Sequence, residues 1–150
     1  MRPRHLLILL LLGAVPVALA LLLAGGGGTK RARGVPVAQL SLQLIDGSSA
    51  VALAACGVTH HYTAYRAGAT VRFRGRITQP GNWSVTLKLK ACTSGAFRPS
   101  GGATGKVLPD RSSYEGSFPA PIGGYYFARA ELKQGNALVA RSDKRYFHVR

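Results

Sequence analysis

The segment Thr70–Cys92 alternates regularly between apolar and polar residues. Its apolar positions are Val71, Phe73, Ile77, Trp83, Val85, Leu87 and Leu89. The positions between them include Arg72, Arg74, Arg76, Lys88 and Lys90. A period of two predicts strands with one buried and one exposed face. Because proline presets φ and glycine accepts a positive φ, Pro80-Gly81 favours a type II turn. The segment is therefore predicted to form a β-hairpin.

This hairpin would place five cations on one exposed face: Arg72, Arg74, Arg76, Lys88 and Lys90. Like charges on one face of a sheet are destabilising unless an anion or an acidic strand lies nearby. The face is therefore a candidate anion-binding site, with anionic envelope polymers or lipid headgroups as partners. The alternative is an ordinary solvated face of a very basic protein. Nucleic acid fits less well, because no aromatic residue interleaves with the basic positions to stack on bases.

Residues 1–24 are predicted to direct the chain to or through a membrane. Basic MRPRH precedes an uncharged apolar run, Leu6–Ala24. The run is longer than a typical secretory h-region, which favours a retained, single-pass signal-anchor helix. Cleavage as a signal peptide remains an alternative, since Ala18-Leu19-Ala20 and Ala24-Gly25-Gly26 fit the small-x-small pattern. In either case the rest of the chain is expected outside the cytoplasm, anchored or secreted.

Charge is distributed unevenly beyond this segment. Residues 25–34, GGGGTKRARG, are predicted to be a flexible basic linker. Five of the 20 Lys and Arg residues flank the apolar run, so residues 35–150 keep fifteen together with all five acids, a net charge of about +10. Such a surface favours association with anionic partners, although net charge alone does not identify one.

Residues 35–150 are predicted to form one all-β domain of roughly seven to nine strands. Extended patterns besides the hairpin occur at Val35–Ile45, Ala50–Val58, His60–Tyr65, Ser112–Phe118, Gly124–Leu132, Ala137–Arg141 and Arg145–Val149. Residues 93–111 lack periodicity and are predicted to be a long loop. No helix is expected after residue 24.

The closing strands carry a resemblance. The stretches SYEGSF (113–118), GYYFARA (124–130) and SDKRYFHV (142–149) resemble the last strands of bacterial Ig-like or fibronectin-III-like domains. Such domains occur in exported surface proteins of high-GC Gram-positive bacteria. The resemblance covers roughly the last 95 residues and implies an antiparallel β-sandwich with a binding or spacer role. It implies no catalytic residues, and Cys56 and Cys92 lie closer together than the antibody-type core pair.

The only two cysteines, Cys56 and Cys92, are predicted to form a disulfide in an exported domain. Two free thiols are the alternative. Closing this loop would stabilise the fold by roughly 3–4 kcal/mol in the chain-entropy treatment. Cys92 continues the exposed register of Lys88 and Lys90, so the bridge is expected at an end or edge, where it ties the hairpin to the Ala50–Val58 strand.

Catalytic and metal-binding patterns are weak. Adjacent His60 and His61 would point to opposite faces of a strand, so no metal site is predicted. The chain lacks a GxSxG motif, and its five acids are scattered. We therefore expect a non-enzymatic envelope module without cofactors. The alternative is a protein–protein module that uses a free sheet edge or the 93–111 loop.

Overall fold

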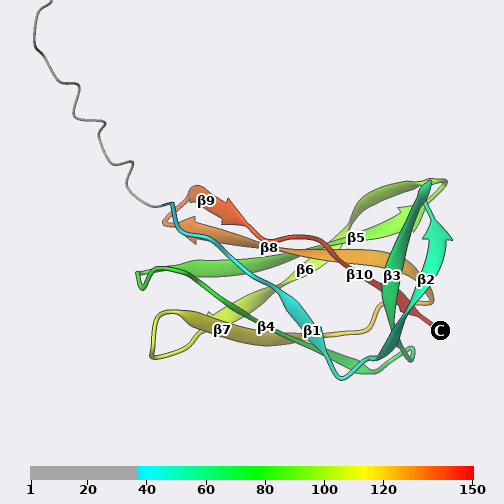
Figure 1. The fold of residues 1–150 in the computed structure, drawn as a ribbon, viewed down its shortest axis with the longest axis horizontal. Helices are drawn as coiled ribbons and strands as arrows, with labels where there is room; N and C mark the ends of the chain where they lie inside the picture. The colour runs from blue at the N-terminus through cyan, green and yellow to red at the C-terminus, as the bar shows by residue number, and fades with distance from the viewer. Residues whose placement is uncertain (1–36) are drawn as a thin grey trace, which may run out of the picture. The chain divides into compact units, whose positions relative to one another are not determined.

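The computed structural model describes residues 37–150, which form ten strands and contain no helix (Figure 1). The all-β prediction is confirmed. The strands are β1 (Gln43–Ile45), β2 (Ser48–Ala55), β3 (Val58–Tyr65), β4 (Thr70–Arg76), β5 (Ser84–Thr93), β6 (Ala96–Val107), β7 (Ser113–Pro119), β8 (Gly124–Gln134), β9 (Ala137–Arg141) and β10 (Arg145–Val149). The predicted hydrophobic helix and linker, residues 1–24 and 25–34, lie outside the described residues. Across residues 37–150, no helix has the length and hydropathy needed to span a membrane.

The strands form one curled sheet in the order β1-β4-β7-β6-β5-β8-β10-β3-β2, with β9 also paired to β8 (Figure 1). The long strand β6 connects its two parts. Residues 96–105 of β6 pair with β5, whereas Lys106 and Val107 pair with β7. Neighbouring strands are antiparallel except β3 and β10, which run parallel. The curl is what allows one sheet to enclose a core.

The hydrophobic core lies inside this curl. Phe73 of β4 and Phe118 of β7 pack in the same cluster as Leu87 of β5 and Phe147 of β10. The rings of Phe118 and Phe147 are 5.9 Å apart, and that of Tyr126 stacks on Phe147 at 5.3 Å. Alternating residues of the central strands supply these side chains, as the period-two pattern predicts.

The predicted hairpin of residues 70–92 is wrong. β4 pairs with β1 and β7, whereas β5 pairs with β6 and β8. Both edges of β4 are therefore occupied, and the chain crosses from one part of the sheet to the other after Arg76. Trp83 folds back over the expected turn, and its Nε1 donates a 2.9 Å hydrogen bond to the Gln79 carbonyl. The alternation identified the buried faces correctly but not the partner strands.

The predicted 93–111 loop is also wrong, because most of it is β6. Thr93 pairs with Ala96, and the two residues between them, Ser94 and Gly95, have φ of 51° and 79°. Two consecutive positive φ values are typical of the type I′ turns that close tight hairpins. β5 therefore forms its hairpin with β6. The strand was missed because Gly and Pro interrupt its periodicity.

The same turn geometry divides the predicted Ala50–Val58 strand. Ala55 pairs with Val58, and Cys56 and Gly57 between them have φ of 50° and 74°. The segment is therefore the end of β2, a turn and the start of β3. Cys56 lies in the turn rather than in a strand. The strands predicted in the last forty residues, β7 to β10, are confirmed with small shifts at their ends.

Three side chains attach the short strand β1 to the rest of the domain. The hydroxyls of Tyr65 and Tyr114 donate hydrogen bonds to the carbonyls of Ile45 and Ser41, and Arg145 Nε donates to the Leu42 carbonyl at 2.7 Å. These donors come from β3, β7 and β10. Because β1 pairs in the sheet with β4 alone, they fix its position against the neighbouring strands.

Candidate functional site

The structure divides the five predicted anion-binding residues into two groups. Arg72, Arg74 and Arg76 lie on β4, and Lys88 and Lys90 lie on β5. Since β4 and β5 belong to different parts of the curled sheet, the single five-cation ribbon is wrong.

The β4 arginines have acidic and polar neighbours. Arg72 forms a bidentate ion pair with Asp46 at the surface. The hydrogen bond from Arg72 lowers the pKa of the Asp46 carboxyl, so the pair remains charged on both sides. Arg74 donates a 3.4 Å hydrogen bond to Gln43, and Glu115 of β7 lies directly opposite it in the register. We call the arginines of β4 the β4 stripe. Asp46 and Glu115 are its acidic neighbours, which could not be identified from the sequence.

Lys88 and Lys90 instead line a concave surface on the outer face of the sheet. In the pairing of β5 with β8, Lys88 lies opposite Arg129 and Lys90 lies opposite Phe127. The hollow over these strands has a volume of about 710 Å³. We call it the basic groove; it is lined by Lys88, Leu89, Lys90, Phe97, Pro99, Gly101, Phe127, Arg129, Glu131, Arg141 and Lys144.

The groove combines five basic side chains with one acidic side chain. The acidic residue, Glu131, pairs with Arg141 at 3.1 Å, and the side chain of Glu131 is only 15% exposed. Four basic side chains of the groove are not part of this ion pair: Lys88, Lys90, Arg129 and Lys144. Arg129 Nε is buried and has no hydrogen-bond partner among the described residues. A buried donor without a partner costs free energy.

Aromatic rings form part of the groove. Phe127 is 6% exposed, and the Nζ atoms of Lys90 and Lys144 lie 5.9 and 4.9 Å from its ring centroid. Phe97 contacts Phe127 edge-on at 5.0 Å. The expectation that no aromatic residue interleaves with the basic positions is therefore wrong, because cross-strand pairing brings Phe127 beside Lys90. Contacts of this kind hold the ammonium groups over a ring face.

An aromatic cluster continues from the groove beneath the β2–β3 hairpin. Tyr62 is fully buried and contacts Tyr125 and Tyr146 edge-on at 5.4 and 5.5 Å. Burial, with smaller effects from the two neighbouring tyrosines, raises the pKa of Tyr62. Its hydroxyl has no hydrogen-bond partner within residues 37–150. The outer face of the sheet therefore carries a second apolar layer, separate from the core.

The disulfide between Cys56 and Cys92 is confirmed. It joins the turn between β2 and β3 to the end of β5, with a Cα–Cα distance of 5.7 Å. Cys92 shares the outward register of Lys88 and Lys90, as expected from the sequence. The turn between β5 and β6 follows directly after it, so the bridge links the tips of two hairpins. It holds the β2–β3 hairpin close to the aromatic cluster and to the end of the groove.

Two of the histidines, His60 and His148, stack on tyrosine rings. The imidazole of His60 stacks on Tyr146 at a centroid distance of 3.9 Å, and that of His148 stacks on Tyr125 at 5.8 Å. In the part of the chain that the structure describes, no three His, Cys, Asp or Glu side chains are grouped as metal ligands.

Comparison of the chain with protein-family models and with curated proteins gives no match. Two of the groove's basic residues, Lys88 and Lys90, were predicted from the sequence, whereas Arg129, Arg141 and Lys144 were not. The signal available was the outward parity of Arg129 in the strand Gly124–Leu132. It could not be used without knowing that this strand pairs with β5.

Proposed function

We propose that this chain is a non-enzymatic binding module that acts outside the cytoplasm. Its basic groove would hold an anionic polymer of the cell envelope, with residues 1–24 as the membrane anchor. We also propose that the curled sheet is an Ig-like sandwich, because β4 and β7 share one core with β5, β8 and β10. The observation that carries the function is a 710 Å³ hollow with five basic side chains, one acidic side chain and two aromatic rings.

The shape of the groove favours a polymer over a lipid surface. Lys90 and Arg129 are half-buried within the hollow, where a flat bilayer reaches them less readily than a single chain does. A strand of polymer can enter the hollow, place its anionic groups beside the lysines and pack a sugar or polyol unit on Phe97. Aromatic rings with adjacent cations suit alternating apolar and charged units. Lipid headgroups and nucleic acid are therefore alternative outcomes of the test.

The test compares two variants with equal loss of charge. Lys88→Gln/Lys90→Gln alters the groove, and Arg74→Gln/Arg76→Gln alters the β4 stripe without breaking the Arg72–Asp46 pair. The full-length protein, oxidised and in a non-ionic detergent, is titrated with polyphosphate and with polyglutamate over a salt series. Parallel titrations use anionic lipid nanodiscs and single-stranded DNA.

We expect polymer binding to weaken with salt and to fall roughly 3- to 30-fold in the groove variant at low salt, from two exposed ion pairs. The β4 variant should retain nearly full affinity. An equal loss in both variants would show that net charge, rather than the groove, drives binding. Stronger binding to nanodiscs or to DNA than to the polymers would replace the polymer with that partner.

A free sheet edge supports the second candidate, a protein–protein module. β2 is the last strand of the sheet order, and its residues are mostly exposed, including Val51 at 56%. No Asp, Glu, Lys or Arg occurs in the segment Gly47–Tyr65, although the domain is highly basic. Exposed, uncharged edge strands accept a further strand by backbone pairing. The 93–111 segment no longer contributes as a loop, since most of it is β6.

Sedimentation equilibrium in density-matched detergent tests self-pairing through this edge. Association through β2 should persist at high salt and be lost in Val51→Lys, with Lys88→Gln/Lys90→Gln as the control. A monomer at all salt concentrations would exclude a second copy as the partner.

A further inference from the structure

The far half of the β2–β3 hairpin is only weakly attached to the sheet. β2 is the last strand of the sheet order and pairs with β3 alone. β3 in turn pairs with β10 only over residues 63–65. Within the part of the chain that the structure describes, residues 51–62 therefore form no backbone ladder with the rest of the sheet. We call residues 51–62 the arm. Because an isolated two-stranded hairpin is marginally stable in water, the arm needs other contacts to stay in place.

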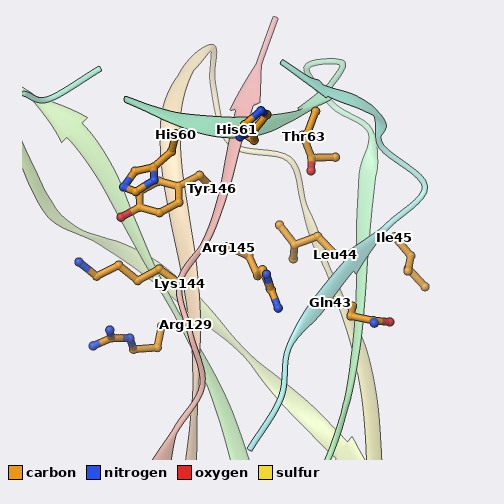
Figure 2. Close-up of a pocket in the computed structure, with 11 residues that line it drawn as sticks. Gln43, Leu44, Ile45, His60, His61, Thr63, Arg129, Lys144, Arg145 and Tyr146 are labelled. Atoms are coloured by element: carbon orange, nitrogen blue, oxygen red, sulfur yellow. The ribbon is translucent and has the colours of Figure 1, made fainter. Parts of the chain in front are cut away.

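Aromatic rings and one covalent bond supply these contacts. The imidazole of His60 lies against the ring of Tyr146 of β10, at a centroid distance of 3.9 Å (Figure 2). Tyr62 meets Tyr125 and Tyr146 edge-on. At the tip of the arm, the disulfide of Cys56 joins the turn to the end of β5. This bond limits how far the arm can move, so it reduces the conformational entropy that the arm would gain on release.

The packing of the arm includes an unfavourable contribution. Tyr62 is fully buried, and its hydroxyl has no hydrogen-bond partner among residues 37–150. A buried hydroxyl without a partner costs free energy, which hydration would recover. Lifting the arm exposes apolar rings, which is unfavourable, and hydrates this hydroxyl, which is favourable. Because the two effects oppose each other, the disulfide contributes strongly to holding the arm closed.

The disulfide is accessible to a small thiol. Cys56 and Cys92 are both partly exposed. Lys90 precedes Cys92 by two residues on the same face of β5. Its ammonium group places positive charge near the bond, which favours the approach of an attacking thiolate.

We propose that the Cys56–Cys92 disulfide is a redox latch, which a dithiol opens to release the arm from the aromatic cluster. A thiolate of the dithiol attacks one sulfur of the bond and forms a mixed disulfide with it, while the other cysteine leaves as a thiolate and takes up a proton. The second thiol of the dithiol then displaces the first cysteine. The dithiol is thereby oxidised to a disulfide by two electrons, and both cysteines are reduced to thiols.

Release of the arm uncovers the rings of Tyr125 and Tyr146 beside the basic groove. Tyr146 contacts Phe97 and Phe127, which line the groove, at centroid distances of 5.9 and 5.8 Å. The apolar lining of the groove would thus continue onto the uncovered rings. This change in the ligand-binding surface rests on the proposed function, whereas release of the arm is independent of it.

The test compares the full-length protein in non-ionic detergent, without any polymer, before and after treatment with dithiothreitol. Alkylation followed by mass spectrometry confirms the reduction. The imidazole NMR signals of His60 report on its stacking against Tyr146, and those of His148, which stacks on Tyr125 outside the arm, are the internal reference. We expect reduction to move the His60 signals toward those of a solvated histidine and to change those of His148 less. Hydrogen exchange of the arm amides should become at least tenfold faster, while Leu87 in the core keeps its protection.

The variant Cys56→Ser/Cys92→Ser is the matched control. It should show the released His60 signals without reduction and should not respond to dithiothreitol, which separates loss of the bond from a direct effect of the reagent. If this variant does not fold, reduction of the folded wild-type protein still decides the question.

Unchanged His60 signals after complete reduction would overturn the proposal, since the rings alone would then hold the arm. An equal loss of protection at Leu87 would overturn it as well, because the domain would then unfold as a whole. A bond that dithiothreitol reduces only in the presence of urea would also contradict a latch. None of these outcomes depends on polymer binding in the basic groove.

Discussion

The Tyr65 hydroxyl couples the stability of the domain to alkaline pH. The side chain is 4% exposed, and its hydroxyl donates a hydrogen bond to the Ile45 carbonyl. The pKa of Tyr65 is raised to about 12, mainly by burial and to a smaller extent by the charge of Asp46. In an unfolded chain the pKa of tyrosine is about 10.

The sign of the effect follows from the two pKa values. Because the folded pKa is the higher one, the unfolded chain releases the proton first as the pH rises. The stabilisation is fully present below pH 10 and is lost as the pH rises through about 12. A difference of two pKa units corresponds to about 2.7 kcal/mol of free energy of unfolding.

This contribution to the free energy of unfolding is measured by urea unfolding of the wild-type protein and of Tyr65→Phe between pH 8 and pH 12.5. At pH 8 the variant should be less stable by about 1 kcal/mol, because it lacks the hydrogen bond to Ile45. At the alkaline end the order should reverse, since only the wild type carries the ionisable phenol. The contributions of the other tyrosines and lysines to the pH dependence cancel in this comparison, because these residues are present in both proteins. A constant difference across the pH range would refute the reasoning.

Three further variants test the fold. Replacing both Cys56 and Cys92 by Ala should lower the free energy of unfolding by about 4 kcal/mol, from a loop with a sequence separation of 36; a urea titration showing less than about 1 kcal/mol would contradict the chain-entropy account. Gly75→Ala places a Cβ 2.1 Å from the Ser41 carbonyl oxygen, so thermal unfolding should show a loss of about 1–3 kcal/mol, and an unchanged melting temperature would rule out this close approach. Ser142→Ala removes the buried Oγ that accepts a 2.9 Å hydrogen bond from the Ala130 N–H, so hydrogen exchange at the Ala130 amide should accelerate while the exchange of Leu87, in the core, changes less.

Much of the fold could be predicted from alternation, which identifies the buried face of each strand. Val71 and Phe73 are buried and Arg72 and Arg74 exposed, as their spacing predicts. Alternation carries no information about partners, however, because a strand with one apolar face can pair on either edge. The 70–92 hairpin was wrong for this reason. The decisive turn was Ser94-Gly95, where a serine takes a positive φ.

The groove was only partly predictable for the same reason. Lys88 and Lys90 were recognised from their own strand, but Arg129 and Phe127 reach them through the pairing of β5 with β8. The disulfide was predictable because the chain has only two cysteines, in a domain predicted to be exported. The disulfide holds the β2–β3 hairpin near the aromatic cluster. This effect could not be predicted, because it depends on Cys56 lying in a turn rather than in a strand.

Lysine footprinting of the full-length protein tests the central claim most directly. Reductive methylation is carried out with and without saturating polyphosphate, and the modified lysines are quantified by mass spectrometry. The proposed function predicts protection of Lys88, Lys90 and Lys144, which line the groove, while Lys106 and Lys133, which do not, react as before. Equal protection of all five lysines, or protection of Lys106 and Lys133 alone, would contradict the basic groove as the binding site.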